Sequence, residues 1–274
     1  MSTPGLPLRR GRWLLAGALI AMPVHAQLGL GLSPMRLEFP ATKGKAYSGT
    51  LALTNSADKT VRVRTEIMDF FVDSNQTPQF MPNVAAEAEH SCRQWITINP
   101  METEVEPKRQ ISARYTVRVP ADAGERSYHC AIGFVTLPTT EDLQGIGVRT
   151  ALRVVTTVYP IVGQPMVKGE IAELALEAVA AGDKMRWRGV VVMANAGLML
   201  YRPQGRMAVV DGGGKVVETL EIASFPVLPK RRQRFLLPLK SELAAGRYTL
   251  RAHIDVGTEV QEASVEVTAE LPKR

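Results

Sequence analysis

Short runs of alternating apolar and polar residues recur along almost the whole chain, and this pattern most constrains the fold. In residues 110–119 every second side chain is apolar and the side chains between them are polar. Successive side chains of a strand point to opposite faces, so such a run buries one face and exposes the other. Pro, Gly, Asn and Asp residues separate the runs at the spacing of a sandwich. The sequence therefore predicts an all-β protein.

The strand pattern pauses near residues 162–165, where Gly and Pro occur. This pause predicts two tandem immunoglobulin-like β-sandwich domains, residues 27–163 and 164–274. The runs expected as strands in the first domain are 33–39, 48–55, 61–72, 95–99, 110–119, 128–137 and 147–159. Those expected in the second domain are 170–178, 186–195, 206–211, 215–222, 233–238, 247–254 and 261–268.

The first residues have the composition of a secretory signal peptide. Arg9, Arg10 and Arg12 precede an apolar run, residues 13–24, that is too short to span a bilayer as a helix. Small residues suited to cleavage follow. We expect residues 1–26 to be removed, and the mature chain to lie in the periplasm or an equivalent extracytoplasmic space.

The charge of the chain gives little support to a nucleic-acid partner. The formal net charge is +6, and residues 1–26 hold three basic and no acidic residues, so cleavage halves it. A nucleic-acid-binding protein would need a dense basic face, which the mature chain lacks. The densest basic cluster, residues 230–234, has two readings. It is a solvated loop between strands, or a patch for an acidic or membrane partner.

Two cysteines remain in the exported chain, Cys92 and Cys130. In an oxidising compartment such a pair is expected to form a disulfide. The alternative is a soft-metal site, formed by reduced thiols together with His90 and His129. Adjacent strand residues point to opposite faces, so His129 and Cys130 cannot both reach one ion. We expect the disulfide, and neither a metal nor a cofactor.

The residues do not favour catalysis. The mature chain has three histidines, His90, His129 and His253, and none belongs to a recognisable catalytic triad or zinc motif. The glycine run in residues 211–215 predicts a hairpin turn, since the spacing of a phosphate-binding loop is absent. We expect a protein that is not an enzyme and has no small-molecule substrate.

The first domain resembles a known family, the PapD-like periplasmic chaperones of pilus assembly by the chaperone-usher route. The resemblance covers residues 30–160. It rests on five segments in order: Ser33-Pro-Met-Arg36-Leu-Glu-Phe39, Gly49-Thr-Leu-Ala-Leu-Thr-Asn55, Trp95-Ile-Thr-Ile-Asn-Pro100, Val117-Arg-Val-Pro120 and Val158-Tyr159-Pro160. The second domain is similar in architecture only.

The resemblance implies that a client subunit binds along the last strand of the first domain and in the cleft between the domains. Strand addition of this kind uses main-chain hydrogen bonds and alternating apolar side chains. The candidate client-binding residues on that strand are Ile146, Val148, Leu152 and Val154. The other reading of these residues is that they pack into the domain's own core.

The resemblance also implies a basic pair that holds the client's terminal carboxylate. Arg36 matches the arginine of that pair, and a guanidinium can grip a carboxylate with two hydrogen bonds. The lysine expected near the end of the last strand is absent, because residues 154–158 contain no basic side chain.

Two main functions stay open. The first is a chaperone that holds exported, pilin-like β-rich subunits by strand donation, with an outer-membrane usher as a possible partner. The second is a structural or adhesive immunoglobulin-like module of a cell-envelope assembly, which needs no basic pair. A third, an envelope metal-binding protein, would require free thiols.

Overall fold

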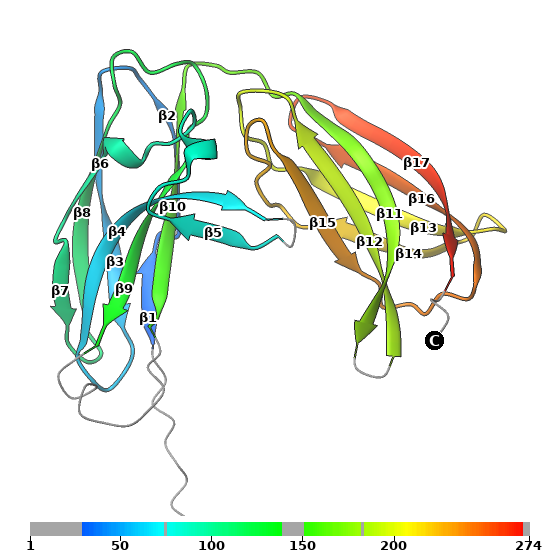
Figure 1. Cartoon of the computed structure of the whole chain (residues 1–274), viewed down its shortest axis with the longest axis horizontal. Coiled ribbons are helices and arrows are strands. Elements are labelled where there is room, and N and C mark those ends of the chain that lie inside the picture. Colours follow the sequence, from blue (N-terminus) through cyan, green and yellow to red (C-terminus); the bar gives the residue numbers. More distant parts are fainter. Residues whose placement is uncertain (1–28, 74–75, 139–150, 182–183, 271–274) are drawn as a thin grey trace, which may run out of the picture.

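The structure is a computed structural model that describes residues 29–73, 76–138, 151–181 and 184–270. It consists of two β-sandwiches that meet at an angle at one end of each (Figure 1). No sheet combines strands from both halves of the described chain. The predicted all-β class with two immunoglobulin-like sandwiches is confirmed. The predicted signal peptide, residues 1–26, lies outside the described residues. The exact domain bounds, 27–163 and 164–274, remain a prediction.

In the first sandwich, one sheet has the order β1-β3-β8-β6 and the other the order β2-β10-β9-β4-β5, with β7 also paired to β4. The bounds are β1 (Leu30–Ser33), β2 (Arg36–Ala41), β3 (Ala46–Asn55), β4 (Val61–Val72), β5 (Pro78–Met81), β6 (Ile96–Asn99), β7 (Glu102–Val105), β8 (Gln110–Arg118), β9 (Cys130–Leu137) and β10 (Arg153–Val162). Two short 3-10 helices, η1 (Ala85–Glu87) and η2 (Arg93–Trp95), lie between β5 and β6.

The alternation in β8 has the predicted effect. Ala113 and Val117 are fully buried between the sheets, whereas Arg114 and Arg118 on the other face are exposed. The core of this sandwich also contains Leu51, Leu53, Ile132 and Phe134. Its apolar faces are therefore those that the sequence pattern indicated.

The prediction of one strand over residues 33–39 is wrong. The segment is divided between β1, which pairs with β3 in one sheet, and β2, which pairs with β10 in the other. Proline has no backbone N–H and fixes its own φ, so Pro34 favours a break in the pairing. The chain thus changes sheets here, and β2 lies parallel to β10.

Other strand limits also differ from the prediction. β5 and β7 were not predicted. β10 begins at Arg153 rather than at residue 147 and continues to Val162. Residues 147–150 lie outside the described residues, and Ala151 and Leu152 are not in a strand.

All of the strands predicted in the second domain are present. They are β11 (Gly169–Ala181), β12 (Lys184–Asn195), β13 (Gln204–Asp211), β14 (Val216–Ile222), β15 (Arg232–Pro238), β16 (Gly246–Asp255) and β17 (Val260–Ala269). One sheet has the order β11-β12-β15 and the other the order β14-β13-β16-β17. The predicted hairpin turn at residues 211–215 is confirmed, with Gly214 at φ +84° and Lys215 O accepting from Asp211 N at 2.9 Å.

The two sandwiches share a tyrosine that fixes a corner of the fold. The Tyr128 hydroxyl donates to Gly124 O at 3.1 Å, and the Tyr248 hydroxyl donates to Ala244 O at 3.0 Å. Each tyrosine thus ties a late strand to the loop before it, a feature of immunoglobulin-like sandwiches. Within the described residues, no helix has the length and apolar character needed to cross a membrane.

Candidate functional site

One half of the outer edge of β10 is not paired with another strand in the described chain, although β1 lies close to it and the Thr156 hydroxyl donates to Pro34 O at 2.7 Å. β10 pairs with β9 from Arg153 to Val158 and with β2 only from Thr157 to Val162. The segment Arg153–Thr156 is therefore an open edge, and Thr157–Val162 is a closed edge. An open edge presents unpaired backbone groups to another strand.

Two hydrogen bonds show which backbone groups point outward. Thr136 N donates to Leu152 O, so the backbone of Leu152 faces β9, whereas Thr157 N donates to Met35 O beside β2. Backbone groups of a strand alternate in direction. The N–H and C=O groups of Arg153 and Val155 consequently point toward the open edge.

The structure places the four candidate strand residues differently from one another. Ile146 and Val148 lie outside the described residues. Leu152 is half-buried just before β10, and Val154 is half-buried against the core of the first sandwich. Val155, which was not a candidate, faces the other way and packs against an apolar cluster between the sandwiches. A client-binding role for the four candidates stays a prediction.

Arg36 lies at the junction of the open and closed edges. It is the first residue of β2 and stands opposite Thr157 of β10. Its side chain is 58% exposed, and its Nε is 4.0 Å from Glu38 Oε2. Arg202, from the loop between β12 and β13, forms an ion pair with the same oxygen, with its Nη1 at 2.7 Å. Two guanidinium groups from different sandwiches thus meet one carboxylate.

An apolar contact joins the two sandwiches beside these charges. Leu200 and Leu228 of the second sandwich pack against Met68, Phe70 and Tyr159 of the first. Each of these side chains is nearly fully buried, and burial of this size stabilises each residue by about 1.5–3 kcal/mol. The contact therefore restricts the angle between the sandwiches.

Hydrogen bonds to the backbone also hold the loop between β12 and β13 in place at this contact. Ser127, just before β9, donates from its N–H to Leu198 O at 2.9 Å, and its hydroxyl accepts from Leu200 N at 2.8 Å. The buried Asn195 side chain shapes the loop from the other end, by donating to Met199 O at 2.8 Å. The loop that carries Arg202 is consequently fixed at both sides.

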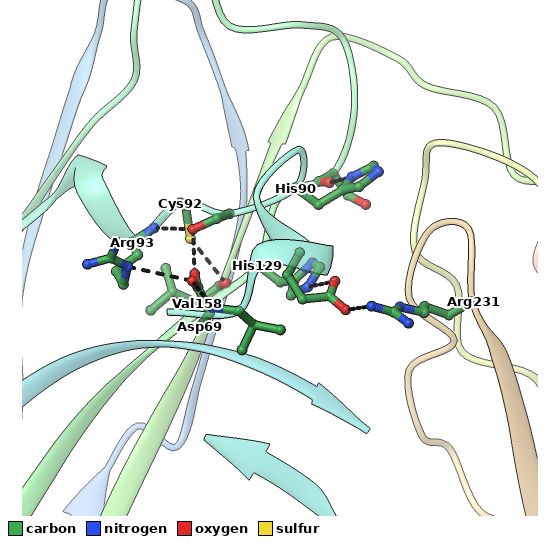
Figure 2. Close-up of polar contacts among 11 residues, drawn as sticks. Asp69, His90, Cys92, Arg93, His129, Val158 and Arg231 are labelled. Carbon is green, nitrogen blue, oxygen red and sulfur yellow. Dashed lines mark hydrogen bonds and ion pairs between the residues drawn. The ribbon is translucent and has the colours of Figure 1, made fainter. Parts of the chain in front are cut away.

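A second ionic contact crosses between the sandwiches and is buried. Glu87, at the end of η1, is 2% exposed and accepts from Arg231 of the second sandwich. Its other oxygen lies 3.0 Å from His129 Nε2, and His129 is also fully buried. Figure 2 shows Arg231 reaching from the second sandwich toward His129 and this carboxylate. Burial alone would raise the pKa of the Glu87 carboxyl, but His129 and Arg231 together hold this pKa below its usual value.

His90 is packed beside this contact. Its ring stacks on that of His129, with centroids 6.3 Å apart, and its Nδ1 lies 3.1 Å from Ser127 O. Burial lowers the pKa of His90, and the neighbouring His129 lowers it further, although the Ser127 carbonyl acts in the opposite direction. His90 is therefore held in its neutral form.

The predicted disulfide between Cys92 and Cys130 is confirmed, with the two Cα atoms 5.3 Å apart. The alternative site with reduced thiols is consequently wrong in this structure. His129 points away from Cys130 toward Glu87, as the alternation of adjacent strand residues requires. Among the residues described, no group of three or more His, Cys, Asp or Glu side chains could hold a metal ion.

The basic residues 230–234 do not form one patch. Lys230 donates from Nζ to Ala196 O, Arg231 pairs with Glu87, and Arg234 donates to Glu177 Oε1 at 2.6 Å. Part of this cluster is an interdomain contact, which neither sequence reading anticipated. Glu87 and Arg202 were also missed. Arg202 lies in a segment that resembles the family only in architecture, and each of the two residues is recognised by partners that are distant in the sequence.

No family model and no curated protein matches this sequence. Solved structures do match. The CupB2 chaperone of Pseudomonas aeruginosa aligns with 87% of this chain and 100% of its own length, at 14% identity and a TM-score of 0.43. A chain in the Salmonella enterica SafA pilin complex with the SafB chaperone aligns over 89% of this chain and 98% of its own, at 13% identity and a TM-score of 0.43.

The E. coli chaperone DraB aligns over 89% of this chain and 99% of its own, at 14% identity and a TM-score of 0.39. Pilus-assembly chaperones, the family to which the first domain was compared, thus align over most of the chain. At these identities and TM-scores the likeness concerns the fold alone.

Proposed function

We propose that this protein is a periplasmic molecular chaperone that holds an exported, β-rich, pilin-like subunit by adding a strand edge to it. The observation that carries the proposal is the open edge of β10, Arg153–Thr156, close to the fixed contact between the two sandwiches. The predicted signal peptide and the disulfide both agree with an oxidising, extracytoplasmic compartment.

Strand addition would use the outward backbone groups of Arg153 and Val155. An extended client segment would donate to and accept from these groups, which replaces water by protein partners along a whole strand. The incoming strand would stand next to β10 and in line with β2. Client specificity would come from side chains on alternate positions.

The end of the open edge, beside Thr156, could receive the carboxyl terminus of the incoming strand. An incoming strand parallel to β10 would meet the first residue of β2 after Thr156, and its terminal carboxylate would then lie near Arg36. The family resemblance implies this role for Arg36, and its exposure leaves it accessible to a client. The function requires no cofactor and no turnover, and an usher is a possible further partner.

The test combines recovery of a client with a measurement at the edge itself. The tagged mature chain is isolated from the periplasm of its host, with Arg36→Ala and Arg251→Ala as matched charge deletions. Arg251 is exposed on β16, away from the cleft. We expect wild type and Arg251→Ala to carry one exported subunit in equal amount, and Arg36→Ala to lose it.

Amide hydrogen exchange then shows where the subunit binds. The amides of Arg153 and Val155 should become protected in the complex, whereas Val154 and Thr156, which face β9, should be protected with and without client. A complex in which Arg153 and Val155 still exchange rapidly would refute strand addition. Recovery of no single subunit would favour the structural or adhesive module.

A further inference from the structure

The meeting of Arg36 and Arg202 at Glu38 resembles an occupied anion site. Arg202 Nη1 is 2.7 Å from Glu38 Oε2 and Arg36 Nε is 4.0 Å from the same atom. A guanidinium can hold a carboxylate through two parallel hydrogen bonds. Here Arg202 is ion-paired with one carboxylate oxygen and Arg36 only approaches that oxygen at 4.0 Å, so neither arginine forms this two-bond arrangement with Glu38.

Arg202 retains an unused donor. Its side chain is 14% exposed and its guanidinium lies over the Tyr159 ring, 5.1 Å from the ring centroid. Within the described chain, its Nη2 is buried and has no hydrogen-bond partner. An unpaired buried donor costs free energy, and an additional acceptor at this position would remove that cost.

The position of the cluster matches the end of the open edge. Arg36 and Glu38 alternate along β2, opposite Thr157 and Tyr159 of β10, so all four side chains lie on one face of the sheet. The loop with Arg202 covers this face from the second sandwich, and Leu200 in the same loop is packed into the apolar contact. A strand that ended beside Thr156 would bring its terminus to these two arginines.

We propose that Arg202 is the second cation of a carboxylate-binding site between the sandwiches, and that Glu38 occupies this site when no client is bound. The ligand is the terminal carboxylate of the strand that adds to β10, so the inference rests on the proposed function. Arg202 thereby replaces the lysine that residues 154–158 lack. The client carboxylate takes the place of Glu38 and accepts from both arginines, including Nη2 of Arg202.

The competing explanation is that Arg202 and Glu38 form only a structural contact between the sandwiches. The two explanations differ in the effect of Glu38. A competitor that is removed strengthens client binding, whereas a structural partner that is removed leaves binding unchanged or weakens it. Substitution of Glu38 by Gln keeps the shape of the side chain and removes its charge.

The probe is a short peptide of alternating valine and threonine residues with a free carboxylate, compared with the same peptide ending in an amide. Calorimetry gives the affinity of the mature chain for both peptides, and amide exchange at Arg153 and Val155 reports strand addition. We expect Arg202→Gln to reduce the preference for the carboxylate form by about tenfold. Glu38→Gln should bind the carboxylate form severalfold more tightly, and Arg251→Gln should behave as wild type.

The outcomes separate this inference from the proposed function. If the peptides protect the two edge amides but Arg202→Gln keeps the full preference for the carboxylate, the inference is wrong and strand addition stands. The same holds if Glu38→Gln binds the carboxylate form no more tightly. If neither peptide protects the amides of Arg153 and Val155, strand addition itself fails.

Discussion

Two ionic contacts join the sandwiches, and they differ in their surroundings. Arg231 meets Glu87 beside His129, and Glu87 and His129 are 2% and 1% exposed, whereas Arg231 is 39% exposed. Arg202 meets Glu38, whose side chain is 29% exposed and lies near the exposed Arg36. The first contact is suited to fixing the angle between the sandwiches. The second is suited to exchanging one carboxylate for another.

The physical basis of this difference is hydration. Removal of one member of a buried ion pair leaves an uncompensated charge away from water, which is strongly destabilising. A partly exposed pair competes with water, so its loss changes stability little. Mutation of Glu87 should therefore mainly lower stability. Mutation of Glu38 should mainly change the proposed binding of a carboxylate.

Loss of the disulfide should have the largest effect, because the bridge anchors the segment that carries the buried contact. Cys92 closely follows Glu87 and His90, and Cys130 follows His129. We expect replacement of both cysteines by Ala to lower the free energy of unfolding by about 3–4 kcal/mol, since the bridge closes a loop with a separation of 38 residues. Urea unfolding of the oxidised wild type and the variant measures this. A loss confined to the second sandwich, where the described chain has no disulfide, would contradict it.

Glu87→Gln should cause the second largest loss in the free energy of unfolding. The substitution leaves Arg231 and His129 without their shared carboxylate, and we expect a loss of about 2–3 kcal/mol, reduced because Arg231 is partly exposed. Urea midpoints at neutral pH provide the measurement. The neighbouring Glu89→Gln is the control, because Glu89 is 67% exposed and its pair with Arg126 should contribute little to the midpoint. Equal midpoints for the two variants would remove the distinction between the contacts.

The buried contact should also introduce a pH dependence. The pKa of His90 is lower in the folded protein than its usual value of 6.5, mainly because of burial, so the unfolded chain binds the proton more readily. Stability should consequently fall as the pH decreases below about 6.5, until the folded-state pKa is reached. Unfolding of wild type and His90→Asn across this range tests this. A wild-type profile as flat as that of the variant would show that His90 does not contribute.

Glu38→Gln should have the smallest effect on stability, under about 0.5 kcal/mol, because the pair it belongs to is partly hydrated. Thermal and urea unfolding, with Glu87→Gln measured in parallel, give the comparison. If Glu38→Gln costs as much as Glu87→Gln, the second contact is structural as well, and its proposed role as an exchangeable site would lose its support.

Local patterns in the sequence were sufficient for the fold. The alternation in residues 110–119 and the glycine turn at 211–215 depend on neighbouring residues, so strand and turn could be predicted there. The break between β1 and β2 was missed because the alternation of residues 35–39 was extended back across Pro34 to Ser33, although the apolar positions change phase there. The change of sheet depends on which partner strand each half meets.

The contacts between the two sandwiches could largely not be predicted, because they also depend on partners that are distant in the sequence. Arg36 was recognised through a family motif, whereas Arg202 becomes relevant only when the angle between the sandwiches brings it to Glu38. Glu87 lies in a polar segment where an exposed carboxylate would be ordinary. Its burial depends on His129 and Arg231, and no local feature indicates either partner.

The change of sheet between β1 and β2 would determine the register of a strand that is added to β10 in the proposed function. β2 is paired with β10 from Thr157 onward. A strand added to the open edge can therefore extend only as far as Arg36, the first residue of β2. In the proposed function, counting residues back from the end of the added strand would then assign each of its side chains to one position along β10. A backbone edge that by itself accepts any sequence would acquire a defined register from the length of a neighbouring strand.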